Sequence, residues 1–378
     1  MDLSIWEKES FYGPRDVTIL GSGFVGLWSA YYLKKHHPQL SVSIIDRGII
    51  PTGASTRNAG FACFGSVTEL IADTLKMGEA NMLDIVEMRY KGLLKIRKTF
   101  PDKEIGYEAS GGYELITPAQ EMDLNILRSN IDWLNQKLRK LIKTNKAFYL
   151  ADAKIDTFGF SGVQHVIENK LEGQLHSGKL CDALLRRVQS MGVTVLNNIE
   201  IKGFEKINGQ IELQTNQPFN LSTNQLLICT NAFARQLLPD LDVEPARGQI
   251  LVTGPIPKLR LKGSFHYNEG FYYFRNLGDR ILLGGARNTA FEEEHTYELT
   301  TSEKIQAELE RFLQTVILPD QQYFIEHRWS GIMGIGAEKI PIIRKLDDNI
   351  FCAVRMAGMG VALAPEIGKM ISKKMVQQ

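Results

Sequence analysis

Cysteine is scarce in this sequence. The 378 residues include four cysteines, Cys63, Cys181, Cys229 and Cys352, and no two of them form a CxxC pair. Thiols spaced so widely exclude a disulfide framework and a cysteine-based metal site, and they are typical of a reducing compartment. The seven histidines show no metal-ligand spacing either. We therefore predict no metal centre and a cytoplasmic location.

Neither sign of charge is in excess, with 44 Lys and Arg against 43 Asp and Glu. This balance does not indicate a nucleic acid or an anionic membrane surface as a partner. One segment, Val17–Leu33, is apolar enough to resemble a signal peptide or a membrane span. It is shorter than a bilayer requires, holds three glycines and follows Glu7, Glu9, Arg15 and Asp16 instead of a basic leader. We expect a soluble protein without a membrane span, and the oligomeric state stays open.

A glycine-rich turn stands near the start of the sequence. The apolar run Val17–Leu20 leads into Gly21, Gly23 and Gly26, and the helix-compatible segment Leu27–Leu33 follows. The first glycine allows a tight turn, the second lets the backbone approach phosphates, and the third lets the helix pack closely on the strand. Free N–H groups at the start of such a helix bind a pyrophosphate.

An acidic residue stands where a dinucleotide ribose requires one. The apolar run Val42–Ile45 ends at Asp46, twenty residues after Gly26. A carboxylate there binds the ribose hydroxyls and disfavours a 2′-phosphate, and therefore NADP. The strand–turn–helix–strand unit predicts a dinucleotide site and leaves FAD and NAD open.

The end of the chain repeats the strand–glycine turn–helix pattern. The strand Ile350–Val354 is followed by Ala357–Gly360 and by the helix Val361–Lys374. A second helix N-terminus therefore presents free N–H groups. If the ligand is a flavin, this helix end would stabilise negative charge at the N1–C2 carbonyl edge of the reduced ring. The alternative is that these glycines only turn the chain.

The segments between the two glycine turns indicate function less specifically than the turns do. Pro51–Gly60 is a polar, glycine-bracketed loop that could contact phosphate, although an ordinary connecting loop is the simpler interpretation of this segment alone. Glu69–Phe100 has apolar residues at every third or fourth position, which predicts a helix whose charged residues form a solvated face. The helix Lys179–Met191 and the strand Gln225–Cys229 form a second βαβ-like layout. Because other material separates this layout from the first, the dinucleotide domain is predicted to be discontinuous.

From Glu244 onward the pattern changes to short, aromatic-rich strands. Gln249–Thr253, Phe271–Arg275 and Arg280–Gly285 fit an antiparallel sheet better than a parallel one. The glycine-rich run 331–336 is predicted to be an irregular loop. A chain of this length can hold two domains, each with its own core.

Ten motifs follow one another along the chain: GSGFVG, Asp46, GASTRNAG, GGYELI, EGQLHSGKLCDALL, LLICTNAFA, EPARGQILVT, FYYFR…ILLGGAR, HRWSGIMG and AGMGVALAPEIG. In these motifs and their order the chain resembles the FAD-dependent glycine oxidase/D-amino-acid oxidase family. The resemblance covers nearly the whole chain. It implies an α/β fold, with a discontinuous doubly wound (Rossmann-like) FAD-binding domain and a second α+β substrate domain built on an antiparallel sheet. It also implies oxidation of the C–N bond of an amine or amino acid, with hydride transfer to flavin N5.

On this basis we expect the FAD-binding domain to comprise residues 1–80, 171–243 and 327–378, and the substrate domain to comprise 81–170 and 244–326. Carried over by position, the predicted FAD-binding residues are Gly21, Gly23, Phe24, Val25, Gly26, Asp46, Arg47, Ser55, Thr56, Arg57, Asn58, Ala59, Gly60, Ile201, Thr230, Asn231, Arg355, Gly358, Met359, Gly360 and Val361. Family members that bind flavin covalently have a histidine near the position of Asn58 or a cysteine in the region 330–344. Neither is present here, so the FAD is expected to be non-covalent.

Two positions depart from the family pattern. Met333 stands where glycine and D-amino-acid oxidases carry the arginine that binds the substrate carboxylate. Leu282 stands where monomeric sarcosine oxidases place a lysine above the flavin. The first departure disfavours a simple amino acid as substrate, and the second leaves the electron acceptor open.

The substrate-positioning groups are expected on the aromatic-rich strand. Alternation along it puts Phe271, Tyr273 and Arg275 on one face. Tyr273 with Arg275 is the preferred pair, with the arginine binding an acidic group and the tyrosine fixing its angle. Arg275 could equally be a surface arginine beside core aromatics. Arg287, at the end of the next strand, is the second candidate anchor, and His266 is a further candidate close to these strands.

Two other functions stay open at this point. A flavin dehydrogenase of a 2-hydroxy acid removes hydride from carbon in a similar geometry but needs a base, for which His266 is the available candidate. A non-catalytic flavoprotein is compatible with methionine at position 333, although the intact flavin motifs argue against it. The expected partner in the leading interpretation is a small amine or amino acid.

Overall fold

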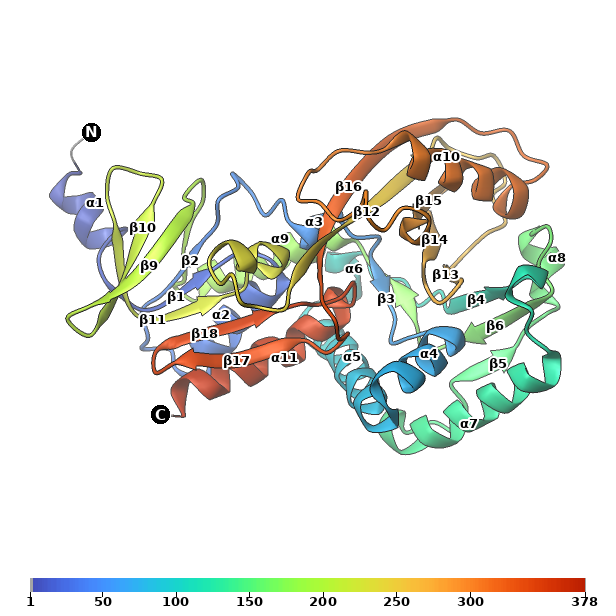
Figure 1. Ribbon diagram of the computed structural model, residues 1–378, viewed down its shortest axis with the longest axis horizontal. Helices are drawn as coiled ribbons and strands as arrows, with labels where there is room; N and C mark the ends of the chain where they lie inside the picture. The colour runs from blue at the N-terminus through green and yellow to red at the C-terminus, as the bar shows by residue number, and fades with distance from the viewer. Residues whose placement is uncertain (1–2, 378) are drawn as a thin grey trace.

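The first glycine turn follows the central strand of a mostly parallel sheet (Figure 1). The structure is a computed structural model that describes residues 3–377. Five of the strands in this sheet (β18, β11, β1, β2 and β8) run parallel to one another. In spatial order the strands are β17 (Ile342–Asp347), β18 (Ile350–Val354), β11 (Leu221–Ile228), β1 (Arg15–Leu20), β2 (Val42–Ile45) and β8 (Thr194–Leu196), with the hairpin of β9 (Ile201–Ile207) and β10 (Gln210–Thr215) attached to β11.

One face of this sheet is covered by α2 (Phe24–His36), α9 (Ser177–Ser190) and α11 (Gly360–Val376). Trp28 of α2 is fully buried, and a side chain at Gly368 of α11 would meet it at 2.7 Å. Glycine therefore lets the two helices pack closely. The other face packs on the β9–β10 hairpin and on the short helical turn η2 (Asn231–Gln236).

A second eight-stranded sheet is antiparallel except where β13 runs parallel to β4. Its outer face holds an aromatic core, in which the rings of Phe265 and Phe274 stack 4.8 Å apart beneath α10 (Glu303–Phe312). In spatial order its strands are β16 (Ile325–Ile335), β12 (Glu244–Thr253), β15 (Arg280–Gly285), β14 (Tyr272–Leu277), β13 (Ser264–Tyr267), β4 (Gly112–Ile116), β6 (His165–Asn169) and β5 (Phe148–Leu150).

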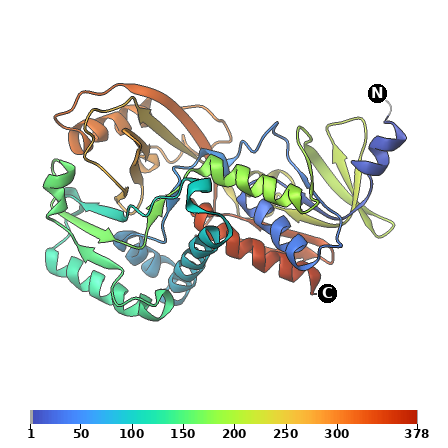
Figure 2. The ribbon, with the colours of Figure 1, turned by 180° about the vertical axis from the view of Figure 1, so that it is seen from behind.

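The long helical segment predicted over 69–100 is two helices. α4 (Val67–Met77) ends at Gly78, whose φ of 85° starts a new direction, and α5 (Glu79–Thr99) follows. Seen from behind in Figure 2, α5 lies beside α11, where a side chain at Gly92 would collide with the carbonyl of Ala362. The remaining elements are α1 (Ile5–Ser10), α3 (Ala54–Arg57), β3 (Phe61–Ala62), α6 (Asp102–Ile105), η1 (Pro118–Gln120), α7 (Leu124–Ile142), α8 (Lys154–Phe158), β7 (Gly173–Gln174), η3 (Arg287–Thr289) and η4 (Leu313–Ile317).

The prediction of an irregular loop over 331–336 is wrong. Residues 325–335 form β16, which pairs with β12 along its whole length. The glycines suit this strand because a side chain at Gly331 would press on Arg57, and one at Gly334 would press on Asn231. Strand pairing thus places residues 327–335 in the second sheet, although they were expected in the FAD-binding domain.

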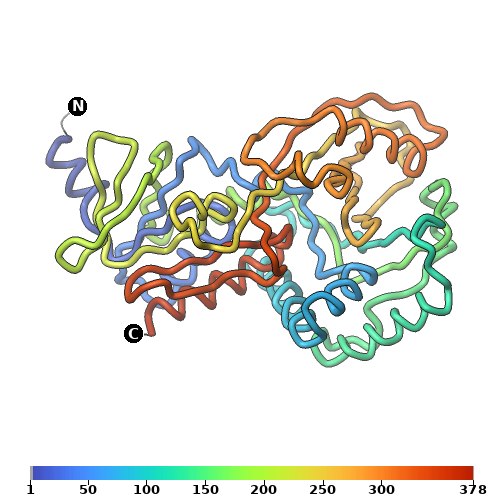
Figure 3. Tube along the Cα trace, viewed as in Figure 1, coloured from blue at the N-terminus to red at the C-terminus, as the bar shows by residue number. Residues whose placement is uncertain are grey.

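The backbone trace runs repeatedly from one sheet to the other (Figure 3). It leaves the first sheet after β2, returns through α9, leaves again along β12 and returns from β16 into β17. The predicted mixed α/β fold, with a doubly wound sheet assembled from separate segments and a second sheet, is confirmed. The domain boundaries themselves remain a proposal. Across residues 3–377, no helix is both long enough and apolar enough to cross a bilayer.

Candidate active site

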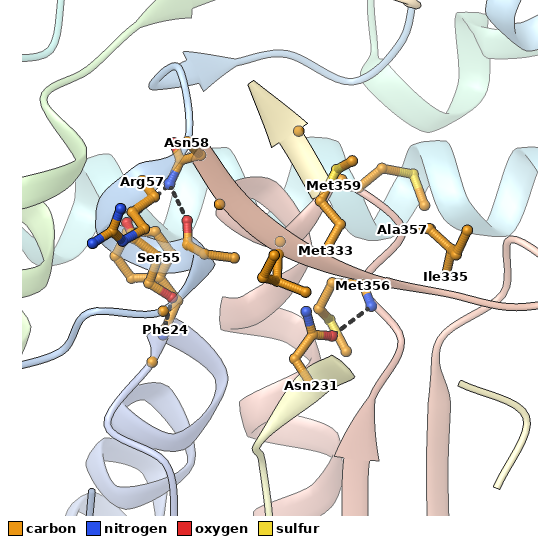
Figure 4. Close-up of a pocket in the computed structure, with 18 of the residues that line it drawn as sticks. Phe24, Ser55, Arg57, Asn58, Asn231, Met333, Ile335, Met356, Ala357 and Met359 are labelled. Carbon is orange, nitrogen blue, oxygen red and sulfur yellow. Dashed lines mark hydrogen bonds between the residues drawn. The ribbon is translucent and has the colours of Figure 1, made fainter. Parts of the chain in front are cut away.

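A cleft of about 1040 Å³ lies between the two sheets. Its walls come from the turn after β1, the end of β2, the α3 loop, the start of α11 and the inner face of the second sheet. Figure 4 shows the middle of this cleft, where residues of α3, β16 and the turn before α11 approach one another. Segments far apart in the sequence therefore build one site.

The turn after β1 has the geometry that its glycines predict. Gly21 has a φ of 99°, and a side chain at Gly26 would lie 2.1 Å from the carbonyl oxygen of Gly21. No side chain of its own caps the start of α2, and the N–H of Phe24 donates to the hydroxyl of Ser55 at 2.8 Å. The positive end of α2 therefore faces the cleft beside a small hydroxyl, an arrangement that suits a phosphate.

Asp46 lies at the end of β2 and lines the cleft. Its carboxylate accepts hydrogen bonds from the N–H and hydroxyl of Ser22 at 2.8 and 2.6 Å, and from the N–H of Gly48 at 2.8 Å. These bonds fix the carboxylate at the cleft edge. Next to it, the Arg47 guanidinium lies 3.8 Å from the ring centre of Phe233, which makes a flat wall.

The α3 loop is held in place by its own side chains. Asn58 donates to the carbonyls of Ala54 and Ser55 and accepts from the N–H of Gly60 and the hydroxyl of Ser177. Arg57 bonds to the carbonyl of Ser330 on β16 at 2.9 Å. The loop is therefore a rigid part of the cleft, which the interpretation as an ordinary connection did not anticipate.

The second predicted helix start also opens on the cleft. α11 has no side-chain cap, and the residues before it, Gly358 and Met359, line the cavity. The Asn231 amide oxygen accepts from the N–H of Met356 at 3.2 Å, one of the dashed bonds in Figure 4. This bond ties the turn before α11 to the end of β11.

The inner face of the second sheet contributes Tyr273. Its ring passes over Gly284, where a side chain would come within 2.4 Å of it, and its hydroxyl lies 3.6 Å from where a side chain at Gly248 would begin. Burial raises the pKa of Tyr273 to about 12, so its hydroxyl is protonated at neutral pH. Arg287, after β15, also lines the cleft and lies 4.6 Å from the ring centre of Phe291. Burial lowers the pKa of the Arg287 guanidinium.

His266 lies beside Tyr273 on the neighbouring strand, with its ring 5.1 Å from that of Phe61. The side chain is buried, and its Nε2 atom has no hydrogen-bond partner among the described residues. Burial lowers the pKa of His266 to about 4. The ring is therefore neutral and only weakly basic.

A cluster of charged residues lines part of the cleft. Lys339 bonds to Glu69 at 2.8 Å and to Asp73 at 2.9 Å, and Arg89 bonds to Glu69 at 3.0 Å. Burial alone would raise the pKa of Glu69, but the two cations outweigh it and hold this pKa low. These acids and Arg89 were predicted to form a solvated helix face, and that prediction is wrong. The Ser66–Glu69 capping box, which the structure contains, is the sequence signal that could have pointed to part of this cluster.

Most of the predicted site residues come together in the cleft. Those that line it are Gly21, Gly23, Phe24, Val25, Asp46, Arg47, Ser55, Arg57, Asn58, Ala59, Gly60, Ile201, Thr230, Asn231, Gly358, Met359, Gly360, Val361, His266, Tyr273 and Arg287. Gly26 instead packs behind the turn. Contact of these residues with FAD or substrate stays a prediction.

Besides Gly26, three predicted residues do not reach the cleft. Thr56 turns back and donates to the carbonyl of Pro51 at 2.6 Å. Arg355 is buried against Asp242 and the carbonyl of Ile340. Arg275 lies on the predicted face of its strand, but its guanidinium donates to the backbone carbonyls of Gly60 and Leu175 at 3.0 and 2.8 Å. It anchors the backbone behind the cleft and is not placed to bind a substrate.

The comparison with protein families decides the assignment, because the model of the FAD dependent oxidoreductase family, DAO, matches residues 16–374. The chain belongs to this family. The two helix starts without side-chain caps, the fixed acid at the ribose position and the size of the cleft all fit its cofactor, FAD.

The relatives of this DAO-family chain are distant. It is 23% identical to the bifunctional protein ThiO/ThiG of Synechocystis over 96% of its length, but it spans only 52% of that relative. A D-amino acid dehydrogenase of Vibrio atlanticus is 21% identical, with 94% and 95% of the two chains covered. Among solved structures, an L-proline dehydrogenase from P. horikoshii has a TM-score of 0.78, 19% identity and coverage of 97% and 94%. Glycine oxidase from Geobacillus kaustophilus has a TM-score of 0.76, 18% identity and coverage of 96% and 95%.

Replacing Asp46 by alanine should weaken FAD binding by roughly one to two orders of magnitude. The change removes a charged acceptor for the ribose, which contributes about 1.5–3 kcal/mol. Calorimetric titration of the apoprotein with FAD measures the effect. Ser22→Ala is the matched control, because it removes one hydrogen bond to the carboxylate but leaves the acid in place. Equal affinity of Asp46→Ala and wild type would show that Asp46 is not the ribose ligand.

Proposed function

We propose that this FAD-dependent oxidoreductase oxidises the C–N bond of an amino acid whose carboxylate is bound by Arg287. The observation that carries the proposal is the unpaired cation beside Tyr273. Within residues 3–377, the Arg287 guanidinium has no carboxylate at ion-pair distance. The acid that acts on it electrostatically, Glu294, is bound to Arg247 at 2.7 Å. A half-buried cation of this kind suits an anionic ligand.

The chain's own residues would orient the substrate. Arg287 binds the carboxylate, and the protonated hydroxyl of Tyr273 donates a hydrogen bond that sets its angle. Bound FAD supplies the acceptor for the hydride that leaves the substrate carbon. The loops and helix ends around the cleft hold this geometry, because Asn58, Arg57 and Asn231 are each tied to neighbouring backbone.

Relatives that act on amino acids support the substrate class. A D-amino acid dehydrogenase, an L-proline dehydrogenase and glycine oxidases are among the similar proteins. The substrates in their names differ in chirality and in substitution, and what these substrates share is that each is an amino or imino acid. We propose this class for the present chain, with a cytoplasmic location and non-covalent FAD.

A 2-hydroxy acid as substrate is disfavoured by His266. Removing hydride from a C–O bond needs a base to take the hydroxyl proton, and the buried His266 ring is only weakly basic because its pKa is lowered to about 4. Steady-state assays with amino acids and their 2-hydroxy analogues, using an artificial electron acceptor, separate the two reactions. We expect turnover of the amino acids alone. Turnover of the hydroxy acids alone would overturn the proposal, and no turnover of either would favour a non-catalytic flavoprotein.

Arg287→Gln should raise the KM for an amino acid roughly ten- to hundredfold. The variant loses a charge-assisted hydrogen bond of about 1.5–3 kcal/mol. Its FAD content should not change, because Arg287 lies at the second sheet, away from the two helix starts. Arg139→Gln, an exposed residue of α7, is the control. A KM equal to that of wild type would remove Arg287 from the substrate site.

A further inference from the structure

We infer that the substrate carries an apolar substituent that packs on a surface of three methionines, Met333, Met356 and Met359, while its carboxylate binds Arg287. We call these three residues the methionine surface. The inference rests on the proposed function and adds the shape and polarity of the substrate. It makes Met333 a specificity-determining residue.

The methionine surface forms one wall of the cleft. All three side chains line the cavity, from β16 and from the turn before α11, and Ile335 and Ala357 lie beside them (Figure 4). Met356 and Met359 are each 6% exposed. Met333 lies against the turn, with its sulfur 3.6 Å from where a side chain at Gly358 would begin. The three methionine side chains carry no charge, so they offer a carboxylate no ion pair.

The methionine surface and the carboxylate anchor line the same cleft and approach each other above Gly248. The Met333 methyl group and the Tyr273 hydroxyl lie 3.4 and 3.6 Å from the position that a side chain at Gly248 would occupy. Arg287 stands on the Tyr273 side, because it follows β15, which pairs with β14, the strand of Tyr273. A ligand above Gly248 therefore has a cation and a hydroxyl at one end and thioethers at the other.

This arrangement selects against the smallest amino acids. Glycine as a substrate would bind to Arg287 and Tyr273 through its carboxylate but would not reach the methionine surface. A larger apolar group gains free energy by covering Met333, the partly exposed member of the three, and methionine side chains adapt to ligands of different shape. The preferred substrates are therefore amino acids with an apolar group on the carbon or the nitrogen.

Binding of simple carboxylates tests the inference without turnover. We would titrate the FAD-loaded protein with acetate, propanoate, butanoate and hexanoate in a calorimeter. Each added methylene should tighten binding by about fourfold in wild type. In Met333→Ala this dependence on chain length should flatten, while the affinity for acetate stays the same. Met370→Ala, on the exposed side of α11, is the control and should behave as wild type.

Gly248→Ala provides a second variant, which leaves all three methionines in place. The new methyl group would make only ordinary contacts of 3.4 and 3.6 Å, so the protein should fold, but the space for the ligand shrinks. We expect hexanoate to lose more affinity than acetate. Binding that depends on Arg287 but not on chain length would overturn this inference alone. Absence of carboxylate binding in wild type would overturn the proposed function as well.

Discussion

Lys339→Met is expected to lower the free energy of unfolding by about 3–5 kcal/mol. Lys339 connects the segment after β16 to α4 through Glu69 and Asp73, both of which are buried. Without the lysine, Glu69 keeps its bond to Arg89, but the buried Asp73 has no ion-pair partner left among the described residues. Removing one partner of a buried ion pair leaves a buried charge without a partner. This loss of stability is larger than the stability that an exposed ion pair contributes.

Urea unfolding of the wild type and of the variant measures this loss. Lys304→Met is the matched control, because Lys304 pairs with Glu293 where both side chains are about half exposed (53% and 54%). The control should unfold at nearly the wild-type midpoint. Equal midpoints for Lys339→Met and Lys304→Met would contradict the structural role given to the cluster.

Gly26→Ala is expected to abolish FAD binding. The new side chain would lie 2.1 Å from the carbonyl oxygen of Gly21, which belongs to the backbone and cannot rotate away. Either α2 moves off β1 or the turn changes shape, and overpacking of this kind costs about 1–3 kcal/mol or more. Both responses displace the N–H groups that are placed to bind the pyrophosphate.

The ratio of FAD to purified protein measures the effect, and circular dichroism checks the fold. Gly203→Ala is the control, because the nearest contact of its new side chain is the flexible amide of Gln214 at 2.9 Å. It should retain FAD. A Gly26→Ala protein with full FAD content would show that the pyrophosphate does not bind at this turn.

The sequence predicted best what depends on neighbouring residues. The turn at Gly21, the acid at the end of β2 and the second turn at Gly358 follow from local chain geometry, and the structure places all three at one cleft. The strand β16 was predicted to be an irregular loop because glycines, judged from neighbouring residues alone, favour loops. Here they are selected by contacts with Arg57 and Asn231, which lie far away in the sequence.

The two arginines of the substrate region show the same limit. Alternation put Arg275 on the inner face correctly, but no local pattern reveals that the backbone carbonyls of Gly60 and Leu175 occupy its guanidinium. Arg287 became the better candidate for the carboxylate anchor only once the fold showed that Glu294 forms its ion pair with Arg247 and not with Arg287. Likewise, no sequence signal pointed to Lys339, whose partners are more than 260 residues away.

Anaerobic mixing of the FAD-loaded protein with an apolar amino acid tests the proposed chemistry most directly. The amino acid is used with hydrogen and with deuterium on its α-carbon, and the visible absorbance of the oxidised flavin is followed. We expect the absorbance to disappear, and to disappear more slowly with deuterium, because the C–H bond beside nitrogen is broken. Absorbance that no amino acid or amine changes, but that a 2-hydroxy acid removes, would contradict C–N oxidation by this protein.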